Sequence, residues 1–166
     1  MNSRNTFFGY VVVAITMASQ QAWAGDSCSL LTPAEFAAIV GRKADSAPGG
    51  SGKVCTATFD GYQATAQLQV VSGFGMSGRY SGLVNFWKEE NAKARKRGEP
   101  VEEKTIGDVF CSAKVPHFSS PGTECMKELP GERVLYARVS APMGSGKAPP
   151  METARKLLAA ALPRIE

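Results

Sequence analysis

Apolar and polar residues alternate most regularly in the first half of the chain. Every second residue from Tyr62 to Val70 is apolar, and the residues between them are Gln or Thr. A period of two is typical of a β-strand with one buried face, so strands are predicted over residues 53–59 and 62–71. Asp60-Gly61 lies between the two segments and favours a tight hairpin turn. We expect this pair in a sheet that has one solvated face.

Three further strands are predicted in the second half of the chain. Every second residue from Val109 to Val115 is apolar, which indicates a strand over residues 106–115. Residues 123–129 and 132–140 flank a Pro-Gly turn and form a second predicted hairpin.

The best-defined helix signal follows the first cysteine. Thr32 is suited to cap a helix, Pro33 suits its first turn, and Glu35 completes a T-x-x-E capping box. Gly41 is suited to end this helix, because glycine readily adopts the left-handed backbone conformation at a helix C-terminus. A second predicted helix begins near Leu83 and ends in a basic cluster, and a third covers residues 151–162, where Ala and Leu form an apolar stripe.

The order of these elements indicates an α+β fold. The elements follow one another as helix, hairpin, helix, three strands and helix. This order resembles a helix-plus-hairpin unit that occurs twice, with an additional strand and a closing helix in the second copy. Short strands joined by tight turns favour an antiparallel sheet of about five strands, and we expect helices to cover it on one face.

Residues 1–24 have the pattern of a cleavable signal peptide. Arg4 precedes an apolar run over residues 7–15, and Ala22-Trp23-Ala24 provides the small residues that signal peptidase requires. The run is shorter than the roughly 20 residues of a membrane span. We therefore expect cleavage after residue 24, a single domain over residues 25–166 without a transmembrane segment, and a periplasmic or secreted protein.

The four cysteines of the chain indicate disulfides, because their number is even and they follow a secretory signal. Three pairings are possible, of which Cys28–Cys55 and Cys111–Cys125 are favoured because each joins one half of the chain locally. A zinc site or a redox-active pair would need closely spaced cysteines such as C-x-x-C, which the sequence lacks. The residues before Cys28 also lack the apolar position of a lipid-attachment signal.

Charge and histidine content narrow the function classes. A formal net charge of +4 is too small to indicate nucleic-acid binding. Because the chain has a single histidine, most kinds of metal site and most catalytic triads are excluded. No catalytic residue, cofactor or metal site is predicted.

A glycine-rich segment over residues 73–78 matches G-x-G-x-x-G. The strand before it is half polar, and the residues about 20 positions later include a basic helix end and a glycine rather than the acidic residue of a dinucleotide site. We therefore expect a glycine loop in which Phe74 and Met76 rim a pocket or contact a partner, with Tyr80 and Trp87 nearby.

The segment between Cys111 and Cys125 contains His117 and Phe118. A disulfide-pinned loop loses little entropy on binding, so this loop is a candidate contact between a small inhibitor and a target hydrolase. The alternative is a small hydrolase that uses His117 as its base, although the sequence has no G-x-S-x-G motif. The interpretation that the sequence favours is a solvent-facing loop histidine without a role in either activity.

The opening of the predicted domain resembles a known group of proteins. Cys28-Ser29-Leu30-Leu31-Thr32-Pro33-Ala34-Glu35, a cysteine in the following strand and Ile106-Gly107-Asp108 are similar to small secreted or lipoprotein domains of unknown function, best represented in actinobacteria. The resemblance implies an extracytoplasmic α+β domain with a Cys28–Cys55 bridge, and it brings no catalytic residues.

We therefore predict a non-enzymatic periplasmic or secreted module that binds a small ligand or an envelope or other partner protein. Inhibition of a hydrolase through the Cys111–Cys125 loop and hydrolysis through His117 are the alternatives.

Overall fold

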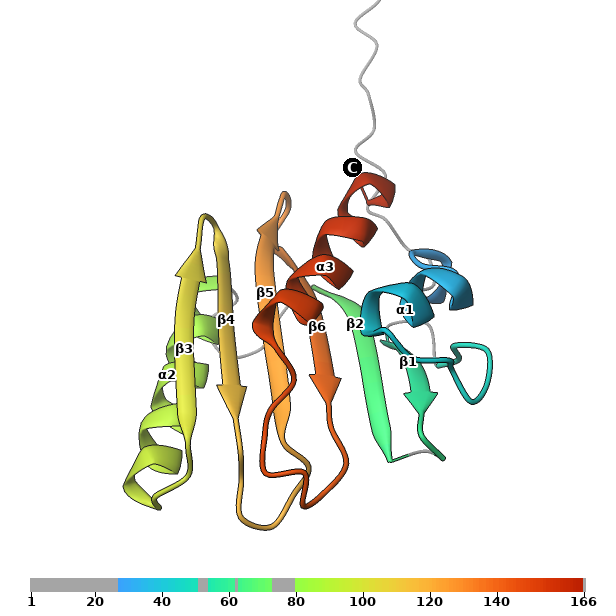
Figure 1. Ribbon diagram of the computed structural model, residues 1–166. Helices are drawn as coiled ribbons and strands as arrows, with labels where there is room; N and C mark the ends of the chain where they lie inside the picture. The colour runs from blue at the N-terminus through green and yellow to red at the C-terminus, as the bar shows by residue number, and fades with distance from the viewer. Residues whose placement is uncertain (1–26, 51–53, 62, 73–79, 166) are drawn as a thin grey trace, which may run out of the picture.

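The computed structural model describes residues 27–50, 54–61, 63–72 and 80–165, and they form one antiparallel sheet with helices on both faces (Figure 1). The six strands lie side by side in the order β1-β2-β6-β5-β4-β3. They are β1 (Val54–Phe59), β2 (Ala64–Ser72), β3 (Val101–Ile106), β4 (Val109–Lys114), β5 (Gly122–Leu129) and β6 (Arg133–Ser140). The predicted signal peptide lies outside the described residues.

Within the described residues, three α-helices and two short 3₁₀ helices accompany the sheet. They are η1 (Ser27–Ser29), α1 (Pro33–Val40), α2 (Tyr80–Lys96), α3 (Met151–Ala161) and η2 (Leu162–Arg164). In Figure 1, α1 and α3 lie in front of the sheet and α2 lies behind β3 and β4. No helix of the described part of the chain is long and apolar enough to cross a membrane.

The described residues form six strands rather than about five, because the strand predicted over residues 106–115 is β4, and β3 precedes it as a strand that the sequence analysis does not predict. Ile106 ends β3, Gly107 turns the chain with a φ of 63°, and β4 begins at Val109. β3 lies at the edge of the sheet, and its central residues Glu102-Glu103-Lys104 are charged. An edge strand of this composition lacks the apolar alternation by which the other strands are predicted.

Helices cover both faces of the sheet, so the expectation that they cover one face is wrong. Alternate residues of a strand point to opposite faces, and both faces of β4, β5 and β6 bury apolar side chains. The larger core lies under α1 and α3 and includes Leu135 and Leu157. The smaller core lies under α2 and is formed by Phe110, Met126 and Val134.

A helix followed by a hairpin occurs twice in chain order, as α1-β1-β2 and α2-β3-β4, whereas the second hairpin predicted from the sequence is β5-β6. A two-fold rotation about an axis perpendicular to the sheet would exchange the outer hairpins β1-β2 and β3-β4. Such a rotation would leave the helices of both units on the same face of the sheet. Because α1 and α2 lie on opposite faces, the two units are not related in this way.

The start of α1 is built as its sequence predicts, and it is fixed to the other end of the chain. The Thr32 hydroxyl accepts from the Glu35 backbone N–H, and the Glu35 carboxylate accepts from the Thr32 N–H at 2.8 Å. Arg164 donates to the Glu35 carboxylate at 2.6 Å and to the Leu30 carbonyl oxygen. Hydrogen bonds from Arg164 and Thr32 lower the pKa of Glu35 to about 2. Gly41 ends the helix with a φ of 74°.

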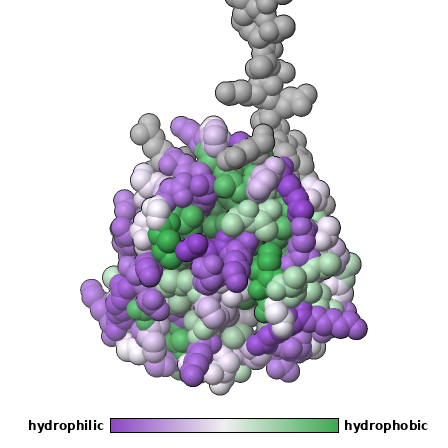
Figure 2. Space-filling view, turned by 45° about the horizontal axis from the view of Figure 1, so that its top comes forward, coloured by the Kyte–Doolittle hydropathy of each residue, from purple (hydrophilic) through white to green (hydrophobic). Residues whose placement is uncertain are grey.

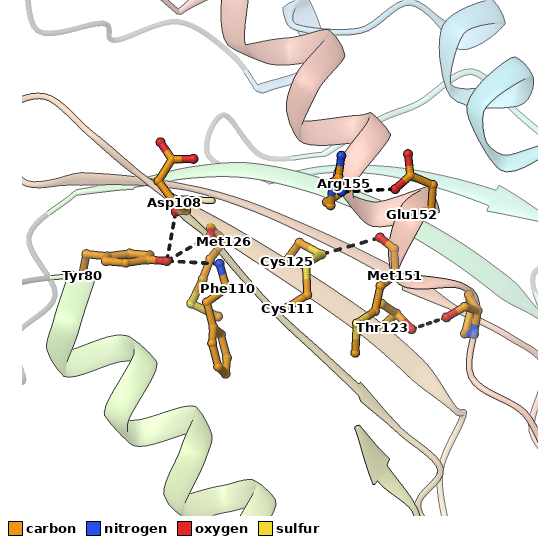
Figure 3. Close-up of a disulfide and its surroundings, with 11 residues drawn as sticks. Tyr80, Asp108, Phe110, Cys111, Thr123, Cys125, Met126, Met151, Glu152 and Arg155 are labelled. Carbon is orange, nitrogen blue, oxygen red and sulfur yellow. Dashed lines mark hydrogen bonds and ion pairs between the residues drawn. A yellow bond between two sulfur atoms is a disulfide. The ribbon is translucent and has the colours of Figure 1, made fainter. Parts of the chain in front are cut away.

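The two disulfides join the predicted pairs. Cys28–Cys55 links η1 to β1, and Cys111–Cys125 links residues that lie directly opposite each other on β4 and β5 (Figure 3). The second bridge therefore lies within the sheet and three residue pairs away from the end of the β4–β5 hairpin, where Lys114 faces Gly122. It does not close the neck of the loop over residues 115–121.

Candidate functional site

On the face seen in Figure 2, apolar patches are interspersed with hydrophilic side chains. Single exposed apolar residues are normal on protein surfaces and do not define a site. A pocket that combines aromatic and charged side chains is the stronger indication.

One such pocket lies beside the C-terminal half of α2, where the sheet meets the loop over residues 115–121. Its volume is about 320 Å³. We call it the Gly122 pocket; its lining residues are Trp87, Arg97, Glu99, Lys114, Pro116, Phe118, Ser119, Ser120, Gly122, Glu124 and Arg138. It thus combines two residues that the sequence singles out separately, Trp87 and Phe118.

Strand pairing brings the polar residues of the pocket together from three strands. Lys114 on β4 pairs with Gly122 on β5, and Glu124 pairs with Arg138 on β6. Side chains two residues apart share a face, so these residues lie on the side of the sheet that carries Phe110, under α2.

Glycine at position 122 leaves a gap between the neighbouring strands. A Cβ atom at this position would lie 3.5 Å from both Nε and Nη2 of Arg138 and 3.6 Å from the Val139 carbonyl oxygen. The guanidinium group of Arg138 therefore borders the space that any larger side chain at Gly122 would occupy.

The cations of the pocket have different partners. Lys114 Nζ lies 5.8 Å from the ring centroid of Trp87, within the range of a cation–π contact. Arg97 donates twice to the carboxylate of Glu99, at 3.1 and 3.0 Å, and this pair lowers the pKa of Glu99. Lys114 and Arg138 belong to none of the ion pairs between described residues.

Glu124 is a buried carboxyl group at the inner wall, with 6% of its surface exposed. Burial raises its pKa, while the Tyr136 hydroxyl that donates to it and the nearby charges of Arg138 and Lys114 oppose that rise. The pKa of Tyr136 is raised as well, first by burial and then by the Glu124 charge.

We expect Glu124→Gln to increase the free energy of unfolding at neutral pH. Because the folded-state pKa is raised above the ordinary value of 4.5, the stability from this carboxyl group is complete below pH 4.5 and is lost as the pH rises through the folded-state pKa. Gln cannot ionise but retains an oxygen that accepts from Tyr136. Urea unfolding between pH 4 and pH 8 measures the difference. Glu128→Gln is the control, because Glu128 lies on the same strand but is exposed; its free energy of unfolding should depend on pH as that of wild type does. If the free energy of unfolding of Glu124→Gln also depended on pH as in wild type, the prediction would be contradicted.

Tyr80 lies away from the Gly122 pocket, at the start of α2 (Figure 3). Its hydroxyl accepts from the Phe110 N–H at 3.2 Å and lies 3.3 Å from the carbonyl oxygens of Asp108 and Met126. Burial raises its pKa. These bonds anchor the first turn of α2 to the β3–β4 turn and to β5, which is a structural role.

His117 and Phe118 lie at the tip of the loop beside the pocket. His117 Nε2 lies 3.1 Å from the Arg97 carbonyl oxygen, to which it can donate, so the ring ties the loop to the end of α2. Among the described residues, no hydrogen bond joins His117 to a serine or a carboxylate. Phe118 is 91% exposed.

Phe74 and Met76 lie outside the described residues. Local sequence patterns do not identify Lys114, Gly122, Glu124 or Arg138 as pocket residues, with one exception. Arg138 is a charged residue in the otherwise apolar segment over residues 134–139, and a charge in such a place often marks a site.

The described part of the chain contains no group of three or more His, Cys, Asp or Glu side chains placed to hold a metal ion. A comparison of the chain with protein-family models finds no match, and a comparison with curated proteins finds none either.

Proposed function

We propose that this chain is a non-enzymatic binding module of the periplasm or the extracellular space, and that it takes a small ligand into the Gly122 pocket. The observation that carries the proposal is the convergence of Trp87, Lys114 and Arg138 on one cavity of about 320 Å³. Pockets for small ligands begin at about 300 Å³ and combine aromatic walls with a few polar groups.

The extracytoplasmic location is supported by the cysteines. All four form disulfides, which persist in oxidising compartments and are rare in the cytosol. The signal-peptide pattern of residues 1–24 and the resemblance to small secreted domains agree with this location.

The test is a binding screen with a matched pair of variants. We expect the wild-type protein to bind at least one of a panel of amino acids, organic acids, sugars and nucleosides in ligand-observed NMR. Trp87→Leu should weaken that binding about tenfold, equivalent to about 1.4 kcal/mol. Phe86→Leu is the control, because Phe86 neighbours Trp87 in an edge-on contact but does not line the pocket. Equal binding by both variants would contradict the proposal.

Inhibition of a hydrolase is a second candidate, favoured by the exposure of Phe118 at the tip of its loop. The His117 contact to the Arg97 carbonyl oxygen ties one side of the loop to the end of α2, so the exposed aromatic ring lies on a loop that is fixed at one point. Inhibition of a panel of purified hydrolases that is lost in Phe118→Ala would support it, and a panel without any inhibition would count against it.

A further inference from the structure

The Gly122 pocket carries two cations that strand pairing places on either side of a residue without a side chain. We propose that this gap binds the carboxylate or phosphate group of a small organic anion, held between Lys114 and Arg138. This inference rests on the proposed function and specifies the class of ligand.

Charge is the first argument. Arg97 and Glu99 neutralise each other in a two-bond pair, which leaves Lys114, Arg138 and Glu124 as the other charged groups of the lining. Even with Glu124 ionised, these three groups carry one net positive charge. An incoming anion would therefore find an excess of positive charge, and part of that charge is shielded from water.

Space is the second argument. Lys114 is the direct neighbour of Gly122 on one side, and the Arg138 guanidinium reaches to within 3.5 Å of the position of a Cβ atom from the other side. A carboxylate or phosphate in this gap can accept two parallel bonds from a guanidinium group, and the lysine adds a point charge. Any larger residue at position 122 would compete with the anion for that space.

The aromatic rim is the third argument. Trp87 and Phe118 line the same cavity as the two cations, so the remainder of the anion would contact aromatic surface. The volume of about 320 Å³ lies at the lower end of ligand pockets, which favours a ligand of the size of a substituted benzoate over a larger molecule.

The experiment compares three probes of similar shape on the full chain: benzoate, phenyl phosphate and neutral benzamide. We expect the two anions to bind, with shifts of the backbone amide signals of Lys114 and Gly122 in NMR, and benzamide to bind at least about tenfold more weakly. If benzamide binds as well as benzoate, the anion inference is overturned while the proposed function stands. If none of the three binds, the inference fails, and the wider panel screen decides the proposed function separately.

Two substitutions test the anion site between Lys114, Gly122 and Arg138, which we call the cradle. Lys114→Met and Gly122→Val should each weaken anion binding about tenfold or more, the first by removing a charge and the second by filling the gap. Lys88→Met is the matched control, because Lys88 Nζ lies 5.9 Å from the Phe110 ring centroid in a similar cation–π contact but outside the pocket. Thermal unfolding verifies that each variant is folded. Equal losses in Lys88→Met and Lys114→Met would overturn the assignment.

The same anionic group can belong to a free small molecule or to a lipid headgroup. Co-sedimentation with vesicles of phosphatidylglycerol, compared with phosphatidylcholine, separates these sources. Benzoate binding without vesicle binding supports a free ligand. Vesicle binding that Gly122→Val abolishes supports the same cradle with a headgroup as its occupant, whereas vesicle binding that is unchanged in Gly122→Val counts against the cradle.

Discussion

Replacement of Phe36 by alanine is expected to lower the free energy of unfolding by about 3–5 kcal/mol. Phe36 is the one fully buried residue of α1, while Ile39 and Val40 of the same helix pack against the core only partly buried. The packing of this short helix therefore depends mainly on the Phe36 side chain. The loss combines the transfer free energy of the ring with the cavity that remains. Urea unfolding monitored by circular dichroism measures it.

The control makes the same deletion on the surface. Phe118→Ala removes an identical ring that is 91% exposed, and it should change the free energy of unfolding by less than about 0.5 kcal/mol. If both variants lost the same free energy, α1 would not be held by Phe36. The pair also separates stability from binding, because Phe118 lines the Gly122 pocket and Phe36 does not.

Most of the fold could be predicted from local sequence patterns. The β1–β2 hairpin follows from alternation and from Asp60-Gly61, where Asp60 has a φ of 57° and Gly61 one of 64°. The capping box defines α1. These signals are contained within a few residues, so no tertiary contact is needed to interpret them.

The features that the sequence did not predict depend on neighbours distant in the chain. β3 is a strand because it pairs with β4 over residues 101–106, and its own composition gives no alternation. The position of α2 behind the sheet depends on a second apolar cluster around Met126. Both faces of β5 are buried, and a strand buried on both faces does not indicate which helix covers which side.

The candidate site was predictable only in part for the same reason. Trp87 and Phe118 stand out as large aromatic residues in a polar context, and each could be noted without knowledge of the fold. Lys114, Gly122 and Arg138 become neighbours through the register of two hairpins. If the β4–β5 or the β5–β6 register shifted by one residue, Lys114 or Arg138 would point to the opposite face of the sheet, away from the pocket.

Removal of the Cys28–Cys55 bridge in a Cys28→Ala/Cys55→Ala variant is expected to cost about 3.6 kcal/mol, the chain-entropy value for its sequence separation of 27 residues. The bridge joins η1 to β1, and the adjacent Leu30 and Leu31 are both buried in the larger core. We therefore expect the loss in free energy of unfolding to be accompanied by faster amide hydrogen exchange at these two leucines.

The matched variant removes the other bridge. Cys111→Ala/Cys125→Ala opens a cross-link with a sequence separation of 14 residues, for which the same relation gives about 3 kcal/mol. Because β4 and β5 remain paired along their whole length, benzoate binding at the Gly122 pocket should persist in this variant wherever it is folded. In this variant, amide hydrogen exchange at Leu30 and Leu31 should become faster only as far as the lower free energy of global unfolding requires. Faster local exchange at these leucines in both variants would show that the Cys28–Cys55 bridge has no specific part in holding the start of the domain against the sheet.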